Sequence, residues 1–359
     1  GHDHDLARYV EESVHSRLLL PSGNVHEEPG TTQWLPSAEV SVVRVTASDV
    51  DSAADLRLPP DQWTDLDGPV RYVDFGGPAD GPRVVCVHGL GGSLVNWLAL
   101  APRLTGTCRV IALDLAGHGL TEAAGRGTDV HSNRRLLDRF LREVVREPVV
   151  LIGNSMGGLI TLLEADKSPD VVTAMVLVDP ALPRPGAQKP DAMVAKAFAT
   201  YALPMIGERF LKHRNRTLSP AQLVGETLAL CCVDPARVPE AVKRESIALV
   251  IARKGQKAPE KAFLGAARSL LKLLARPKRY LATIARVQQP TLLIFGAKDR
   301  LVPVAAGDRA ARRRPDWRYE VHPDLGHVPM LEDAAWTADL VLDWLATVGK
   351  PTAAGIRRD

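Results

Sequence analysis

Short apolar runs alternate with helical patterns from about residue 70 onward, which predicts a sheet covered by helices. Strands are expected at residues 70–75, 83–87, 109–113, 149–152, 172–178, 291–295 and 318–322, and helices at 94–101, 132–145, 155–165, 303–312 and 334–346. Several strand runs are apolar at every position, so both faces of these strands should be buried. The pattern predicts an α/β fold: a mostly parallel twisted sheet with helices on both faces.

The alternation stops at Asp179-Pro180 and resumes after Gln289-Pro290. The residues between show helical spacing and no strand pattern, so we predict an inserted helical cap at the carboxyl ends of the strands. The expected organisation is an N-terminal extension (1–61), a first core part (62–180), the cap (181–289), a second core part (290–350) and a tail (351–359). Within the extension, residues 6–18 have an amphipathic helical pattern and residues 40–45 resemble a strand.

The composition is that of a globular protein, with 45% hydrophobic residues and a net charge of +3 over 359 residues. This balance argues against a nucleic-acid partner. The four cysteines (Cys86, Cys108, Cys231 and Cys232) lack metal-binding spacing, so we expect no metal, no cofactor and a reducing, cytoplasmic location. No apolar run is long enough to span a membrane. A start at Gly1 without Met suggests a trimmed N-terminus.

Residues 153–157 form a G-x-S-x-G motif directly between a predicted strand and a predicted helix. Such a turn is so tight that Ser155 must adopt a strained backbone conformation, and only glycine at 153 and 157 allows the neighbouring backbone to approach. The turn would hold the Ser155 hydroxyl out at the carboxyl edge of the sheet. The motif therefore predicts Ser155 as a nucleophile, against the alternative of a glycine-rich turn with an idle serine.

A serine hydroxyl needs a base and an acid to become a nucleophile. We predict His327 as the base, because Gly326 frees its loop to turn the ring inward, with His322 as the competitor. Asp299 follows a predicted strand end and is the expected acid, with Asp179 on an adjacent strand as the alternative.

The negative charge that develops on the substrate needs two backbone N–H donors. Met156 follows the nucleophile and supplies one. Leu90, on the loop after residues 84–87, is expected to supply the other, with Gly89 and Gly91 as alternatives. His88 is expected to brace this loop and to take no part in proton transfer.

These motifs together resemble the serine-type α/β-hydrolase superfamily over about residues 62–347. The resemblance rests on His88-Gly89, Asp114-Leu115-Ala116-Gly117-His118-Gly119, Gly153-Asn154-Ser155-Met156-Gly157-Gly158, Asp299 and Gly326-His327, with Ser155, Asp299 and His327 in the order this fold uses. The elbow is similar to those of esterases, monoacylglycerol lipases and meta-cleavage-product hydrolases.

The resemblance implies hydrolysis of a carboxylic ester or lipid through an acyl-enzyme on Ser155. A first alternative is C–C bond hydrolysis of the meta-cleavage-product type, which is disfavoured because Val328, and not tryptophan, follows His327. A second is a non-catalytic ligand-binding module on the same fold.

The predicted cap is strongly basic, with 20 Lys and Arg against 7 Asp and Glu. An apolar stripe of Phe263, Leu264, Ala267, Leu270, Leu271 and Leu274 runs beside Lys261, Arg268, Lys272, Arg276, Lys278 and Arg279. The stripe either packs on the core with its charges solvated, or contacts an anionic membrane, which would make the protein peripheral to that membrane.

Overall fold

An eight-stranded sheet lies at the centre of the computed structural model, which describes residues 56–186 and 191–348. Its strands are β1 (Gln62–Asp65), β2 (Pro69–Gly76), β3 (Arg83–Val87), β4 (Arg109–Leu113), β5 (Val149–Asn154), β6 (Val172–Val178), β7 (Thr291–Gly296) and β8 (Arg318–His322). The spatial order is β1-β2-β4-β3-β5-β6-β7-β8. β1 and β2 pair antiparallel at one edge, and all pairs from β4 to β8 are parallel. The predicted fold class is confirmed.

The sheet separates two buried apolar layers, because alternate residues of each strand point to opposite faces. In β3, Val84 and Cys86 pack in one layer, whereas Val85 and Val87 pack in the other. The antiparallel strand β1 was not predicted, because only Trp63 among its four residues is apolar and no run marks it. The patterns at residues 6–18 and 40–45 and the tail at 351–359 lie outside the described residues.

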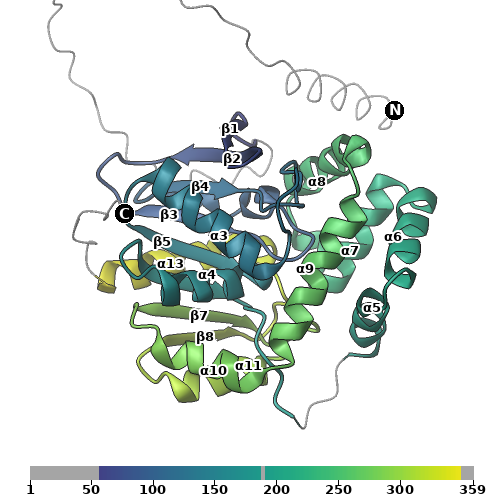
Figure 1. Ribbon diagram of the computed structural model, residues 1–359. Coiled ribbons are helices and arrows are strands. Elements are labelled where there is room, and N and C mark those ends of the chain that lie inside the picture. The colour runs from purple at the N-terminus through teal and green to yellow at the C-terminus, as the bar shows by residue number, and fades with distance from the viewer. Residues whose placement is uncertain (1–55, 187–190, 349–359) are drawn as a thin grey trace, which may run out of the picture. The chain divides into compact units, whose positions relative to one another are not determined.

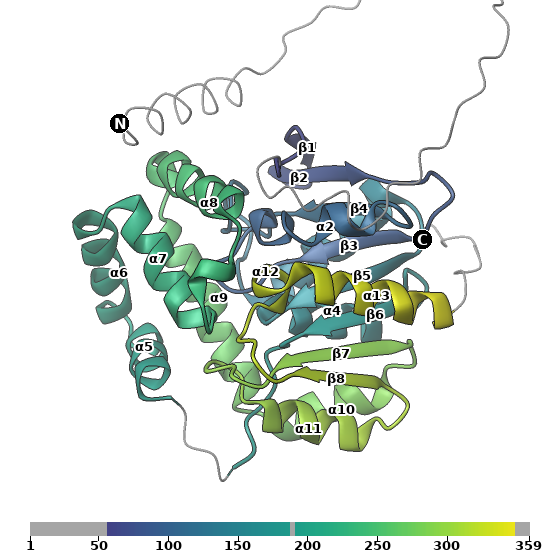
Figure 2. The same cartoon turned by 180° about the vertical axis from the view of Figure 1, so that it is seen from behind.

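Helices cover both faces of the sheet (Figures 1 and 2). One face carries α3 (Val130–Phe140), α4 (Met156–Lys167), α10 (Pro277–Arg286) and α11 (Val304–Arg313); the other carries α2 (Ala101–Leu104), α12 (Pro329–Glu332) and α13 (Ala334–Val348). The expected helices at 132–145, 155–165, 303–312 and 334–346 are present with shifted ends. The first of these ends in a π-helical turn, η3 (Leu141–Val145), and the short helix α12 was not predicted.

The expected helix at residues 94–101 is wrong. The segment instead forms a 3-10 turn, η2 (Leu94–Trp97), which begins at a capping box on Ser93, and α2 starts only afterwards. Pro102 in the first turn of α2 explains the interruption. Proline has no N–H to donate to Leu98, and its ring would clash with that carbonyl in a continuous helix.

The segment predicted as the cap contains α5 (Ala192–Ala202), α6 (Ile206–Thr217), α7 (Pro220–Cys231), η4 (Pro235–Arg237), α8 (Glu240–Ala252), η5 (Arg253–Gly255), α9 (Pro259–Leu274) and α10. Figure 1 shows α5 to α9 beside one end of the strands, whereas α10 lies against the sheet with α4 and α11. The structural cap is therefore α5 to α9.

The apolar stripe of α9 faces inward. Leu264, Ala267 and Leu270 are buried, whereas Lys261 and Lys272 are exposed. Packing against the rest of the protein, one of the two interpretations of this stripe, accounts for these three apolar residues, and contact with an anionic membrane stays a prediction. No helix among the described residues is long and apolar enough to cross a membrane.

Candidate active site

Ser155 lies at a sharp turn between β5 and α4, with φ 56° and ψ −118°. Positive φ is strained for a residue with a side chain. The turn depends on close backbone packing: a Cβ atom on Gly157 would lie 2.1 Å from the Val87 carbonyl oxygen, and one on Gly153 would lie 2.6 Å from the Gly157 carbonyl oxygen. The predicted strained elbow is thus present, and Ser155 remains partly exposed at its apex.

His327 and Asp299 are held together beside the carboxyl edge of the sheet. Nδ1 of His327 lies 2.7 Å from Oδ2 of Asp299, and both side chains are buried. The other oxygen, Oδ1 of Asp299, accepts the backbone N–H groups of Leu301 at 2.7 Å and Val302 at 3.0 Å. A proton on Nδ1, directed at the carboxylate, leaves Nε2 as the nitrogen that can accept a proton.

The alternative base, His322, and the alternative acid, Asp179, each have other partners. His322 packs edge-on against Trp336, with ring centroids 4.9 Å apart, and its Nδ1 accepts from the Asp324 N–H. Asp179 is buried beside Asp299, and its Oδ1 accepts the Gly296 N–H at 3.1 Å. The structure therefore places Asp299, and not Asp179, in the hydrogen bond to His327.

The environment of Asp179 disfavours its charged form. Burial, and then the neighbouring charge of Asp299, raise the pKa of Asp179 well above its usual range. Its Oδ2 is buried without a hydrogen-bond partner among the described residues. The raised pKa favours the protonated form of Asp179.

Asp179, Asp299 and His327 are also the one group of potential metal ligands found in the described part of the chain. A zinc ion between a nitrogen and an oxygen ligand would hold these atoms about 3.3 Å apart. The observed 2.7 Å between His327 and Asp299 is instead a hydrogen-bond distance. The arrangement fits proton transfer better than metal binding.

The loop after β3 lies directly against the elbow. A Cβ atom on Gly89 would approach Cβ of Ser155 to 3.0 Å, and Leu90 follows at the edge of the same turn. Met156 is the first residue of α4, where helix N–H groups have no partner within the helix. Both predicted oxyanion donors therefore lie on segments that border Ser155.

His88 braces this loop from below. Burial lowers its pKa, so the ring is neutral. Its Nδ1 donates to the Gly89 carbonyl at 2.8 Å, and its Nε2 accepts the Leu115 N–H at 3.1 Å. With both ring nitrogens occupied, His88 has the supporting role that the sequence predicted.

The comparisons with known proteins agree with this geometry. The alpha/beta hydrolase family matches residues 84–340, which is well over half of the chain. The chain belongs to the alpha/beta hydrolase family.

Three curated relatives place this hydrolase among enzymes of several kinds. It is 32% identical to the pimeloyl-[acyl-carrier protein] methyl ester esterase of Aromatoleum aromaticum, over 73% of this chain and 97% of that one. It is 25% identical to monoacylglycerol lipase ABHD6 of Rattus norvegicus, over 78% and 80%. It is 28% identical to the dihydrolipoyllysine-residue acetyltransferase component of the acetoin cleaving system of Pseudomonas putida, over 77% of this chain but only 66% of that one.

Two polar residues that hold the His327 loop of the hydrolase were missed in the sequence. Nδ2 of Asn154 donates to the carbonyls of Val178 and His327, at 3.1 and 3.0 Å. Asn154 lies within the elbow motif at a position that the motif leaves open, so its role could have been suspected. It links the turn of Ser155 to the loop of His327.

Glu332 has no comparable sequence motif. Its buried carboxylate accepts the Gly326 N–H at 2.8 Å through Oε2, and the Val233 and Asp234 N–H groups through Oε1 at 2.8 and 3.1 Å. The His327 N–H itself donates to the carbonyl of Cys231, the last residue of α7, at 2.8 Å. The cap and the loop of His327 are therefore bonded directly to each other.

Proposed function

We propose that this hydrolase cleaves carboxylic esters through an acyl-enzyme on Ser155. The observation that carries the proposal is the buried 2.7 Å hydrogen bond between His327 and Asp299, on loops beside the strained turn of Ser155. A nucleophile, an oriented base and a fixed acid are the three parts that acyl transfer by serine requires.

In the proposed reaction, Oγ of Ser155 attacks the ester carbonyl carbon while Nε2 of His327 takes the hydroxyl proton. The N–H groups of Met156 and Leu90 stabilise the oxyanion. Collapse of this intermediate breaks the bond to the alcohol, which leaves with the proton from His327. A water molecule, deprotonated by His327, then attacks the acyl group and releases the acid. Asp299 stays ionised throughout and stabilises the imidazolium.

The names of the relatives support an ester as the substrate, because both a methyl ester esterase and a monoacylglycerol lipase are among them. The position after His327 also favours an ester over the C–C substrates of the meta-cleavage-product type, because it holds Val328 and not tryptophan. We propose a medium or long acyl chain, held beneath the cap.

Replacing Ser155 with Ala tests the proposal. We expect kcat on p-nitrophenyl esters to fall by several orders of magnitude with unchanged thermal unfolding, because nucleophile and base act as one unit. A fluorophosphonate should label the wild-type protein at Ser155 and leave the variant unlabelled. Ser219→Ala, at an exposed serine of the cap, is the control and should retain turnover. More than about a tenth of wild-type turnover in Ser155→Ala is incompatible with the proposal.

A further inference from the structure

Exposed apolar side chains gather at the corner where α5 meets α6. Large exposed hydrophobic residues of the described part of the chain are Trp63, Met193, Leu203, Met205, Ile206, Phe210, Val233 and Val321. Five of these eight lie between residues 193 and 210, and Met205 and Ile206 are 70% and 53% exposed. Single exposed apolar residues are ordinary on protein surfaces, whereas a gathered group indicates an interaction surface. We call Leu203, Met205, Ile206 and Phe210 the apolar corner.

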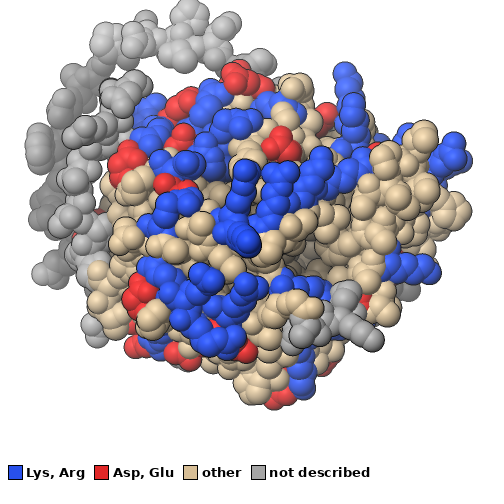
Figure 3. Space-filling model, turned by 60° about the horizontal axis from the view of Figure 1, so that its bottom comes forward, with Lys and Arg blue, Asp and Glu red and all other residues tan. Residues whose placement is uncertain are grey.

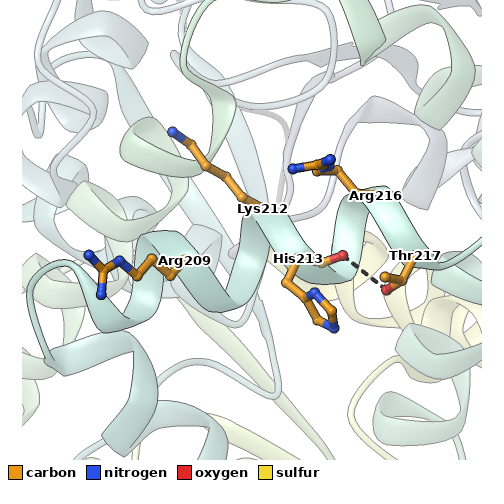
Figure 4. Close-up of a pocket in the computed structure, with 5 residues that line it drawn as sticks. All are labelled: Arg209, Lys212, His213, Arg216 and Thr217. Atoms are coloured by element: carbon orange, nitrogen blue, oxygen red, sulfur yellow. Dashed lines mark hydrogen bonds between the residues drawn. The ribbon is translucent and has the colours of Figure 1, made fainter.

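A row of cations follows the apolar corner along α6. Arg209, Lys212 and Arg216 are exposed at helical spacing and border an open hollow of about 520 Å³. Figure 4 shows Lys212 and Arg216 extending to one side of α6 and His213 to the other. We call these three residues the α6 basic row.

The α6 basic row has no acidic partner within salt-bridge distance among the described residues, a property that it shares with Lys272, Arg276 and Lys278. Two neighbouring arginines do have one: Arg214 pairs with Glu226 at 2.9 Å, and Arg268 pairs with Glu208 at 2.9 Å. The charges of the α6 row are therefore available to an anionic partner.

A second basic area lies on another part of the molecule. Figure 3 shows blue side chains spread over the face that carries α10 and α11, whereas the surface of the cap at the right is largely tan with blue side chains at its margin. The exposed residues Lys272, Arg276 and Lys278 lie in the last turn of α9, in the connection and in the first turn of α10, and none of the large exposed hydrophobic residues named above lies there. Exposed cations therefore lie beside exposed apolar residues at α6, but not at the second basic area.

Aromatic rings connect the apolar corner to the active site. Phe210 packs against Tyr201 with ring centroids 6.4 Å apart, and Tyr201 packs edge-on against Phe263 at 5.3 Å. The ring of Phe263 in turn lies against Gly91, because a Cβ atom there would be 3.0 Å from it. Gly91 belongs to the loop that borders Ser155. An apolar path thus runs from the exposed corner to the elbow.

We propose that the α5–α6 corner docks on an anionic phospholipid bilayer. The apolar corner enters the acyl region, and the α6 basic row binds the lipid phosphates. Interfacial amphipathic helices bind membranes through the same two kinds of contact. The corner combines flexible apolar side chains with unpaired cations. A bilayer can bind both, whereas an acidic protein would bind the cations and leave the apolar side chains exposed. Membrane contact thus lies at α5–α6 and not at the buried stripe of α9.

Co-sedimentation of the full chain with vesicles tests the docking surface. Wild type should bind vesicles of phosphatidylcholine and phosphatidylserine, bind phosphatidylcholine alone weakly, and be released as salt rises. Each basic residue near an anionic surface contributes a factor of about five, so Arg209→Gln/Lys212→Gln/Arg216→Gln should weaken binding about a hundredfold. The control Lys272→Gln/Arg276→Gln/Lys278→Gln removes the same charge from the second basic area and should bind nearly as well as wild type.

The apolar contribution is tested separately. Met205→Ser/Ile206→Ser should weaken binding about a hundredfold, since each side chain contributes roughly tenfold on burial. Val321→Ser, which removes an exposed apolar residue of β8, should bind like wild type. All variants should keep wild-type turnover of a water-soluble ester, because none touches the site.

Three outcomes would overturn the docking surface. The two charge variants could lose vesicle binding equally, or wild type could bind neither kind of vesicle. Met205→Ser/Ile206→Ser could also keep full vesicle binding, which is the result that adsorption by charge alone would give. The proposal does not rest on ester hydrolysis. Vesicle binding without ester turnover would refute the proposed function and leave the docking surface standing.

Discussion

Replacing Asp299 with Asn would show which of the two buried carboxyl groups, Asp299 or Asp179, orients His327. Oδ1 of Asp299 accepts the Leu301 and Val302 N–H groups, and Oδ2 accepts from Nδ1 of His327. An Asn side chain keeps its oxygen on the two N–H donors and turns its NH2 group towards His327. Two donors cannot face each other, so Nδ1 loses its proton and Nε2 carries it. The ring then cannot accept a proton from Ser155.

In a triad with a single acid, this change of tautomer lowers kcat about 10⁴-fold, or about 5 kcal/mol. Here Asp179 lies nearby, with its carboxylate within 4.8 Å of a ring nitrogen of His327. Its pKa is raised partly by the charge of Asp299, so Asn at that position makes Asp179 easier to ionise. As a replacement acid misplaced by an ångström or more, Asp179 should limit the loss to about 10²-fold.

Steady-state turnover of a soluble ester by three variants tests this expectation. Asp179→Asn should stay within a few-fold of wild type, because the residue it replaces is already neutral. Asp179→Asn/Asp299→Asn should show the full loss of about 10⁴-fold. The activity of Asp299→Asn should also require higher pH than that of wild type, because Asp179 must first lose its proton. Equal losses in Asp299→Asn and the double variant, or a large loss in Asp179→Asn, would refute the reasoning.

Two further predictions concern stability and the loop of the base. Burial raises the pKa of Glu164 to about 8, although Arg134 lies 2.7 Å away and opposes the shift. The stability that its proton contributes is complete below the unfolded pKa and is lost as pH rises through about 8. Glu164→Gln should therefore melt like wild type near the unfolded pKa of a glutamate, about 4, and progressively higher than wild type as pH rises towards about 8. A difference in thermal unfolding that is independent of pH would contradict this. Glu332→Gln places an NH2 group against N–H donors. We expect the free energy of unfolding in urea to fall by about 1–3 kcal/mol, and kcat to fall on the order of tenfold because His327 is displaced. If neither value changed, Glu332 would not hold the loop.

The parallel strands and the strained turn at Ser155 could be predicted from the sequence because both depend on local patterns. Each parallel strand is a continuous apolar run, since helices bury both of its faces. The nucleophile turn requires glycine at fixed positions, so Ser155 is marked by its neighbours along the chain. The order of Ser155, Asp299 and His327 then follows from strand ends.

Features that depend on contacts between residues far apart in the sequence have no local sequence pattern. Glu332 looks like any acidic residue near the start of a helix, and its role appears only when Val233 and Asp234 of the cap are folded against it. The α9 stripe had two interpretations, because helical periodicity shows that a face is apolar but not what covers it. The exposed residues of the α5–α6 corner lacked a pattern for the same reason.

The contacts of the cap also divide it into two parts that are attached to different segments. The end of α7 is bonded to the catalytic loop, through the Cys231 carbonyl and the N–H groups held by Glu332, so displacing it would displace His327. The α5–α6 corner is held to α9 by Arg268, which bonds the Tyr201 and Leu203 carbonyls and Glu208. These bonds lie far along the chain from His327. Substitutions at the α5–α6 corner therefore leave the bonds between the end of α7 and the His327 loop in place.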